Sequence, residues 1–80
     1  MVLNELENAE KVVGVKQVRR ALTKGLVKRL YLAEDADPQL TQPLERQGRE
    51  QGVEVAWVGD MKALGKACGI AVGSAVAAII

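Results

Sequence analysis

The sequence contains no histidine, no phenylalanine and only one cysteine among its 80 residues. Without histidine, nucleophilic sites of the Ser-His and Cys-His types are excluded, and so is an ordinary zinc site. A single cysteine, Cys68, cannot form an internal disulfide, which favours an intracellular protein. We therefore expect Cys68 to be a small apolar side chain in a packed helix. We expect no metal, no cofactor and no enzymatic activity.

Aromatic residues are almost absent, because Tyr31 and Trp57 are the only two. A protein that binds single strands by stacking bases on aromatic side chains is therefore not expected. Hydrophobic residues still make up 49% of the chain, so its core must be built from valine, leucine, isoleucine and alanine. Eighty residues give one domain, 1–80, and no repeat or linker divides it.

Signals for export or membrane insertion are also lacking. The first ten residues carry three acids and no base, which is the wrong charge for the start of a secretory signal. The apolar stretch 69–80 is 12 residues long, well short of the ~20 that a membrane-spanning helix needs. We expect this stretch to form a buried strand and the loop that leads into it. We expect a cytoplasmic protein with no membrane partner.

Charge is present but unevenly distributed along the chain. The net charge is only +1, yet residues 11–30 hold seven bases and no acid, whereas residues 31–60 hold seven acids and two bases. We therefore expect one basic face. Such a block is either a solvated helix surface or a surface that binds a polyanion, and charge alone leaves both readings open. The seven bases are Lys11, Lys16, Arg19, Arg20, Lys24, Lys28 and Arg29.

Hydrophobic periodicity predicts helices that alternate with strands. Glycines and the Asp37-Pro38 pair mark the boundaries, since aspartate caps a helix and proline suits its first position. This alternation indicates an α/β fold, a three-layer α/β/α sandwich around a four-stranded mixed sheet. The expected helices are 3–9, 15–24, 38–51 and 61–68, and the expected strands are 12–13, 30–33, 53–58 and 75–80.

The helix over 15–24 carries a row of cations. Lys16, Arg20 and Lys24 are four residues apart, with Gln17 beside them, opposite the apolar stripe. The helix follows Gly14, whose missing Cβ would let an RNA backbone approach the free amides and the positive end of the helix dipole. Lysine and glutamine can read base edges, while the other two cations would hold phosphates. A solvated amphipathic helix remains the alternative.

Four separated blocks extend this pattern. They are residues 14–20, Gly25, residues 33–38 and residues 64–69, which read GVKQVRR, G, AEDADP and LGKACG. In order and spacing they resemble the kink-turn-binding ribosomal protein family (L-seven-Ae-like), over almost the whole chain. The chain looks most like the short bacterial, ribosomal-protein-like members, which carry Gly-x-Lys-Gln at the first block.

The resemblance implies an α/β/α sandwich that binds the kink-turn, a bent RNA element whose tandem sheared G·A pairs open a groove to side chains. It also implies an apolar loop that covers the flipped-out nucleotide of the kink. For Ala71 in that loop, ordinary packing at a strand entry is an equal alternative. Carried over position by position, the implied RNA-binding residues are Gly14, Lys16, Gln17, Arg20, Asp37, Ile70, Ala71 and Val72, to which the charge pattern adds Lys24.

Two departures from longer relatives bear on specificity. Lys16-Gln17 stands where those relatives have Asn-Glu, so an amide replaces the carboxylate that would accept from guanine, and base selection should be looser. Ala71-Val72-Gly73 stands where they have Ser-Arg-Pro, which removes a phosphate-binding arginine. Affinity should therefore rest more heavily on the basic helix.

Two other features have plainer explanations. Glu34, Asp35 and Asp37 suggest a magnesium site only weakly, because aspartate before proline is explained by capping. Lys66 either touches RNA or complements the dipole of its own helix, and the second reading is the simpler one.

The sequence thus predicts a monomer that stabilises kink-turns in ribosomal RNA, a riboswitch or another non-coding RNA, with the ribosome as a further partner and no binding to DNA. The alternative is a ribosome-associated protein-interaction module that docks through an acidic third helix and has no specific RNA site.

Overall fold

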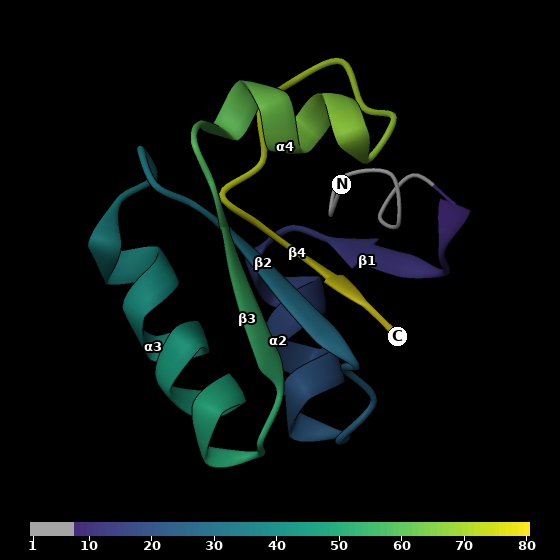
Figure 1. Ribbon diagram of the computed structural model, residues 1–80, viewed down its shortest axis with the longest axis vertical. Coiled ribbons are helices and arrows are strands. Elements are labelled where there is room, and N and C mark those ends of the chain that lie inside the picture. The colour runs from purple at the N-terminus through teal and green to yellow at the C-terminus, as the bar shows by residue number, and fades with distance from the viewer. Residues whose placement is uncertain (1–7) are drawn as a thin grey trace.

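The computed structural model describes residues 8–80, in which three helices pack on a four-stranded sheet (Figure 1). The strand order is β1-β4-β2-β3. β2 and β3 are parallel, whereas β4 is antiparallel to both of its neighbours, so the predicted mixed sheet is confirmed. The elements are β1 (Lys11–Val13), α2 (Val15–Thr23), β2 (Arg29–Ala33), α3 (Pro38–Glu50), β3 (Glu54–Val58), α4 (Met61–Ala67) and β4 (Val76–Ile79). The helix expected at 3–9 lies outside the described residues, except for its last two positions.

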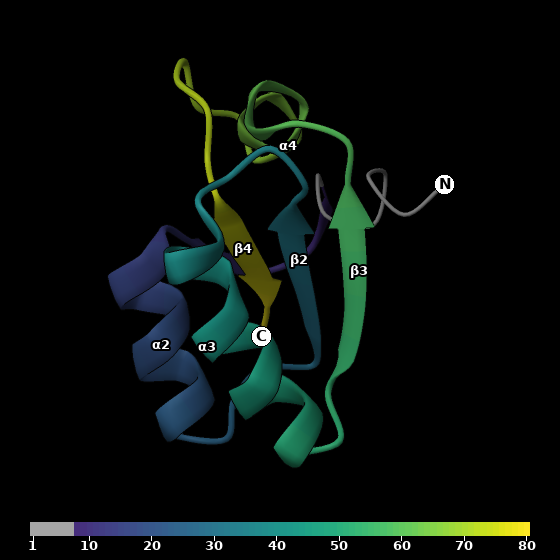
Figure 2. The same cartoon turned by 90° about the vertical axis from the view of Figure 1, so that its left-hand side faces the viewer.

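The sheet separates two hydrophobic clusters, because successive side chains of a strand point to opposite faces. On one face, α2 and α3 stand side by side (Figure 2). They pack there on Leu30 and Leu32 of β2, whereas Tyr31 and Ala33 pack with α4 on the other face. This arrangement confirms the three layers. The first cluster also holds Val18, Ala21, Leu22, Val27, Leu44, Val76 and Ala78, and the second holds Ala36, Val58, Leu64, Ala67 and Ala77.

Helix boundaries follow the signals that predicted them. α2 ends in a Schellman motif, in which Gly25 adopts φ 70° and the amide of Leu26 donates to the carbonyl of Ala21 at 3.0 Å. α3 begins after Asp37, whose carboxylate accepts from the amide of Gln39 at 2.9 Å. α4 begins after Asp60, whose carboxylate accepts from the amide of Ala63 at 2.6 Å.

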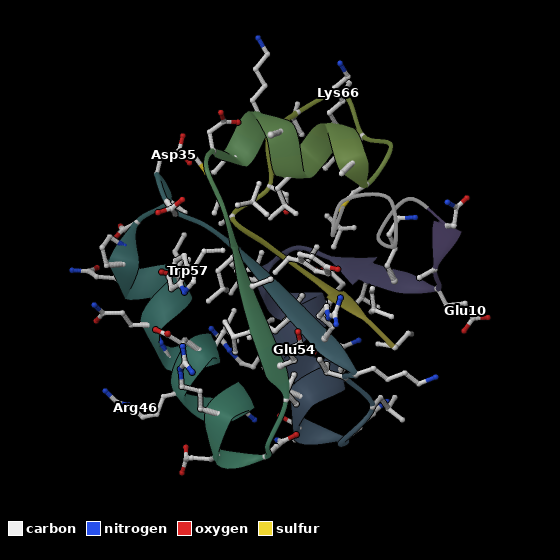
Figure 3. All side chains as sticks on the ribbon, in the orientation of Figure 1. Glu10, Asp35, Arg46, Glu54, Trp57 and Lys66 are labelled. Carbon is white, nitrogen blue, oxygen red and sulfur yellow. The ribbon has the colours of Figure 1, made fainter. Side chains whose placement is uncertain are left out.

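The two aromatic residues occupy opposite environments. Tyr31 is fully buried in the α4-side cluster, whereas Trp57 is 43% exposed on the edge strand β3 and points toward α3 (Figure 3). The buried hydrophobic residues other than Tyr31 are the predicted valines, leucines and alanines, whereas the predicted isoleucines are not among them. The isoleucines, at positions 70, 79 and 80, are at most half-buried.

Candidate nucleic-acid interface

Gly14 fixes the start of α2 against the sheet. Its amide donates to the carbonyl of Val76 in β4 at 3.2 Å, and its carbonyl accepts from the amide of Val18 at 3.0 Å. The backbone of Gly14 adopts φ 101° and ψ 155°, a region that essentially only glycine occupies. The turn from β1 into α2 therefore requires glycine at this position, and the predicted approach of RNA to Gly14 stays a prediction.

The row predicted on α2 is present and faces the solvent. Lys16, Gln17 and Arg20 are exposed, and Lys24 is the exposed C-cap residue. Within residues 8–80 none of these three cations forms an ion pair. Together with Arg19 and Thr23 they line a shallow hollow of about 500 Å³ that contains no acid. Four unneutralised cations along one helix surface create a local positive potential that attracts a polyanion.

The basic face is that of α2, and it does not include all seven bases of residues 11–30. Arg29 lies on β2, on the side of Tyr31, and its guanidinium pairs with the carboxylate of Glu54 at 2.8 Å. Lys11 belongs to β1 and Lys28 to the connection before β2. Lys28 and Arg29 line a hollow together with Glu54, whereas the hollow on α2 contains neither of them. The basic surface is therefore that of α2 alone.

The loop before β4 exposes apolar side chains. Ile70 is 38% exposed, Val72 is 72% exposed, and Ala71 between them is exposed as well. Packing at a strand entry therefore does not explain Ala71. Exposed aliphatic side chains on a short loop are costly in water and favour contact with a partner.

The loop rests directly on α4. A Cβ at Gly65 would collide with the backbone carbonyl of Val72, so only glycine lets the loop approach this helix. The amide of Ile70 donates to the carbonyl of Gly65 at 3.1 Å, and the amide of Ser74 donates to the carbonyl of Met61 at 3.0 Å. Both ends of the loop are thereby fastened to α4.

Gly14, the first turn of α2 and the apolar loop lie at one end of the sheet. The loop 70–72 runs into β4, and the first residue of that strand, Val76, accepts the hydrogen bond from Gly14. In Figure 1 the loop and α4 lie at the same end of the molecule as the start of α3. The structure thus brings Gly14 and the first turn of α2 to the sheet end that carries the loop. Lys24 lies at the far end of α2.

The arrangement agrees with known proteins. Residues 2–80 match the model of the Ribosomal protein L7Ae/L30e/S12e/Gadd45 family. The chain belongs to this family. A protein of Bacillus pumilus named "RNA-binding protein" is 46% identical over 86% of this chain and 84% of its own. "RNA-binding protein YbxF" of Geobacillus stearothermophilus is 41% identical over 94% of this chain and 92% of its own.

A solved structure shares the fold of this L7Ae-family chain. The "Giardia lamblia 15.5kD RNA binding protein" superposes with a TM-score of 0.88 at 27% sequence identity. The similarity covers 98% of this chain and 69% of the other. It confirms the predicted α/β architecture.

Two aspartates near the start of α2 and the apolar loop cap helices in this L7Ae-family chain. Asp37, predicted to face RNA, caps α3 through one carboxylate oxygen. The sequence did not predict a structural role for Asp35. Its carboxylate accepts from the amide of Met61 at 2.8 Å, which ties the β2–α3 loop to the start of α4 (Figure 3). No sequence signal reveals this contact, because the two residues are 26 positions apart.

Cys68 and Lys66 occupy the end of α4. Cys68 is the half-buried C-cap residue rather than an interior helix residue, and it packs against the Tyr31 cluster. Burial raises the pKa of the Cys68 thiol, and the positive charge of Lys11 partly opposes this. Lys66 lies in the last turn of α4 and is exposed (Figure 3). None of the helices within residues 8–80 is both long and apolar enough to span a bilayer.

Proposed function

We propose that this L7Ae-family chain is a non-enzymatic RNA-binding protein that recognises and stabilises kink-turns with tandem sheared G·A pairs. Its RNA would be ribosomal, a riboswitch or another non-coding RNA, and it would act as a cytoplasmic monomer, also on the ribosome. A protein that binds only the folded form of an RNA shifts the population toward that form. The names of the relatives support RNA binding, and the surface around Gly14 supports this particular target.

The first turn of α2 supplies the chemistry for reading purines. Lys16 donates to guanine O6 or N7, and Gln17 both donates and accepts at a base edge. Gly14 presents no side chain, so the RNA backbone can come close to the start of the helix. Arg20 and Lys24, farther along the row, contact phosphates and contribute affinity without selecting sequence.

The apolar loop provides a second contact. Ile70 and Val72, with Ala71 between them, cover the nucleotide that leaves the stack at the kink. Burying their exposed surface contributes free energy of about 25 cal/mol per Å² of apolar area. Asp37 adds an acceptor for a ribose hydroxyl, because only one of its two carboxylate oxygens is used by Gln39.

One observation carries the proposal: the row of cations on α2 begins at the sheet end that carries the exposed apolar loop, and the hydrogen bond from Gly14 to Val76 joins the start of α2 to the strand that follows this loop. A polyanion alone requires the cations but not the loop. An apolar protein partner requires the loop but not the cations. A folded RNA with an unstacked nucleotide uses both.

The test compares two RNA duplexes that differ only in their G·A pairs. A labelled kink-turn duplex is titrated with the protein beside the same duplex carrying Watson–Crick pairs at those positions. We expect the kink-turn to bind at least 100-fold more tightly, about 2.7 kcal/mol. Equal affinity for the two duplexes would show that only general electrostatics operates.

A ribosome-associated protein-interaction module is the second candidate, and the structure weakens the reason for it. α3 is not acidic, because its two acids are balanced by two bases and Glu45 pairs with Arg49 at 2.9 Å. The acids of residues 31–60 lie mostly in loops and on β3. Co-purification with ribosomes that survives digestion of exposed RNA would favour this candidate.

A further inference from the structure

A second, smaller hollow lies on the other flank of α2, beside the edge strand β1. Its volume is about 220 Å³. It differs in chemistry from the hollow above the cation row, because aliphatic side chains make up much of its lining, whereas no acidic side chain lines either hollow. The aliphatic lining comes from Val12, Ala21, Leu26 and Ile80, and the polar lining from Gln17, Arg20 and Lys24.

Leu26 is the unusual member of this lining. Its backbone is held by the Schellman motif through the hydrogen bond to Ala21, yet its side chain is 51% exposed. In such motifs the residue at this position contacts the helix position occupied here by Ala21. Ala21 and Leu26 both line the hollow, and about half of the leucine remains exposed to water. Covering it would remove apolar surface from solvent.

We propose that this hollow binds an acidic segment of a partner protein. The segment places one aliphatic side chain against Leu26 and Ile80 and a carboxylate between Arg20 and Lys24. Charge complementarity supports this occupant, because both ionised side chains of the lining are cations and arginine holds carboxylates with paired hydrogen bonds. An RNA base fits less well, since the lining offers no aromatic ring on which to stack.

The hollow shares two cations with the proposed RNA surface, so occupancy of one should weaken the other. Arg20 and Lys24 line both hollows. A partner carrying such a segment would therefore compete with RNA for this protein. The competition rests on the proposed function, whereas binding of the segment does not.

The test is a titration of the isotope-labelled full chain with the peptide Glu-Leu-Glu-Leu-Glu, followed by heteronuclear NMR and without RNA. We expect saturable shifts at the amides of Ala21, Leu26 and Ile80, with a Kd of about 1 mM or tighter. Glu-Ser-Glu-Ser-Glu should bind at least about tenfold more weakly, because it lacks the aliphatic group. Equal binding of the serine peptide, or no saturable shift, overturns the proposal.

Two leucines provide a matched pair of variants. Leu26→Glu should lower the peptide affinity by about tenfold or more. Leu40→Glu, at a 43% exposed leucine on α3 outside the hollow, should leave it unchanged. Equal loss in both variants overturns the proposal. So does concentration dependence of the same amides without peptide, which would make a second copy the occupant.

Because the peptide titration contains no RNA, its failure leaves the kink-turn proposal standing. Conversely, peptide binding by a protein that fails to discriminate the two RNA duplexes would support the hollow alone. Adding the peptide to a preformed complex with kink-turn RNA then measures the competition. We expect the apparent RNA affinity to fall as the peptide approaches saturation.

Discussion

The side-chain oxygen of Gln17 lies beside the backbone of Gly14, where a side chain at position 14 would have to go. A Cβ built on Gly14 would lie 2.9 Å from Gln17 Oε1, closer than such atoms normally approach. The glycine therefore does two things at once. It adopts a backbone conformation that L residues avoid, and it leaves room for the side chain proposed to read a base.

Replacing Gly14 by alanine should reduce both stability and RNA binding. We expect the free energy of unfolding to fall by about 1–3 kcal/mol, because φ 101° is strained for any residue with a Cβ. Urea denaturation measures this change. Gly59→Ala is the control, since its φ is not positive and a Cβ there meets nothing within 4 Å. Equal losses in the two variants would contradict the assignment of strain to Gly14.

Substitutions along α2 should separate base reading from phosphate binding. Lys16→Ala and Gln17→Ala should each weaken binding of the kink-turn duplex by roughly 1–3 kcal/mol, with little effect on the duplex that lacks G·A pairs. Lys24→Gln should weaken binding of both duplexes and reduce the slope of log K against log salt by about 1.

Arg46→Ala serves as the control for this series, because Arg46 is an exposed cation on α3 (Figure 3). It should alter neither the affinity nor the salt slope. If Lys16→Ala and Lys24→Gln proved indistinguishable on the two duplexes, the first turn of α2 would have no special role in recognition.

Gly65→Ala should displace the apolar loop. The new methyl group would collide with the carbonyl of Val72, and overpacking of this kind costs about 1–3 kcal/mol. The higher helix propensity of alanine, about 1 kcal/mol, offsets part of that cost. We expect NMR shifts over residues 70–74 and weaker binding of the kink-turn. Lys66→Ala, an exposed change in the same helix, should leave the loop signals in place.

Asp37 allows its capping role to be distinguished from RNA contact. Asp37→Ala should lower the free energy of unfolding by about 1 kcal/mol, because the amide of Gln39 loses its acceptor. Asp37→Ser should keep the cap and the stability. If the second carboxylate oxygen accepts from RNA, the serine variant should still bind the kink-turn about 1 kcal/mol more weakly. Unchanged RNA affinity in that variant would limit Asp37 to capping.

The Cys68 thiol should be slow to alkylate at neutral pH. Burial raises its pKa, so the folded chain holds less of the reactive thiolate than the unfolded chain. The iodoacetamide rate should therefore reach its midpoint at a higher pH in the native protein than in urea. Because folding favours the protonated thiol, this group's contribution to stability is present below its ordinary pKa and is lost as pH rises above it.

Lys11→Ala should move the native alkylation midpoint still higher, since the positive charge of Lys11 lowers the thiol pKa. A native midpoint at or below that of the unfolded chain would contradict the role of burial.

The elements could be predicted because their signals are local. Gly25 stops α2, the Asp37-Pro38 pair starts α3, and within residues 8–80 the predicted and observed boundaries differ by at most one residue. Short apolar runs such as 30–33 became strands because they are buried between the two helical layers. The row on α2 could be predicted for the same reason, since helical spacing alone places Lys16, Arg20 and Lys24 together.

Contacts between distant segments could not be predicted in this way. The fit of Gly65 under Val72 depends on how the loop folds back, and the bond from Met61 to Asp35 depends on where two loops meet. The amide side chain of Gln51 caps the carbonyl of Leu22 at 2.7 Å across two helices, again without a sequence signal. Nor could the sequence show which of the seven bases lie apart from the basic face, as Arg29 does because it pairs with Glu54 of the neighbouring strand.

β4, the last strand in the sequence, lies inside the sheet between β1 and β2. Lys11 of the edge strand β1 pairs with Ile79 of β4, a residue 68 positions away in the sequence. During synthesis, β1 and β2 therefore cannot pair with β4, the strand between them, until residues 76–79 have been synthesised. Such non-local pairing slows folding, and the unpaired strands are open to wrong partners meanwhile. The nascent chain thus reaches its RNA-binding form only after its final strand is available.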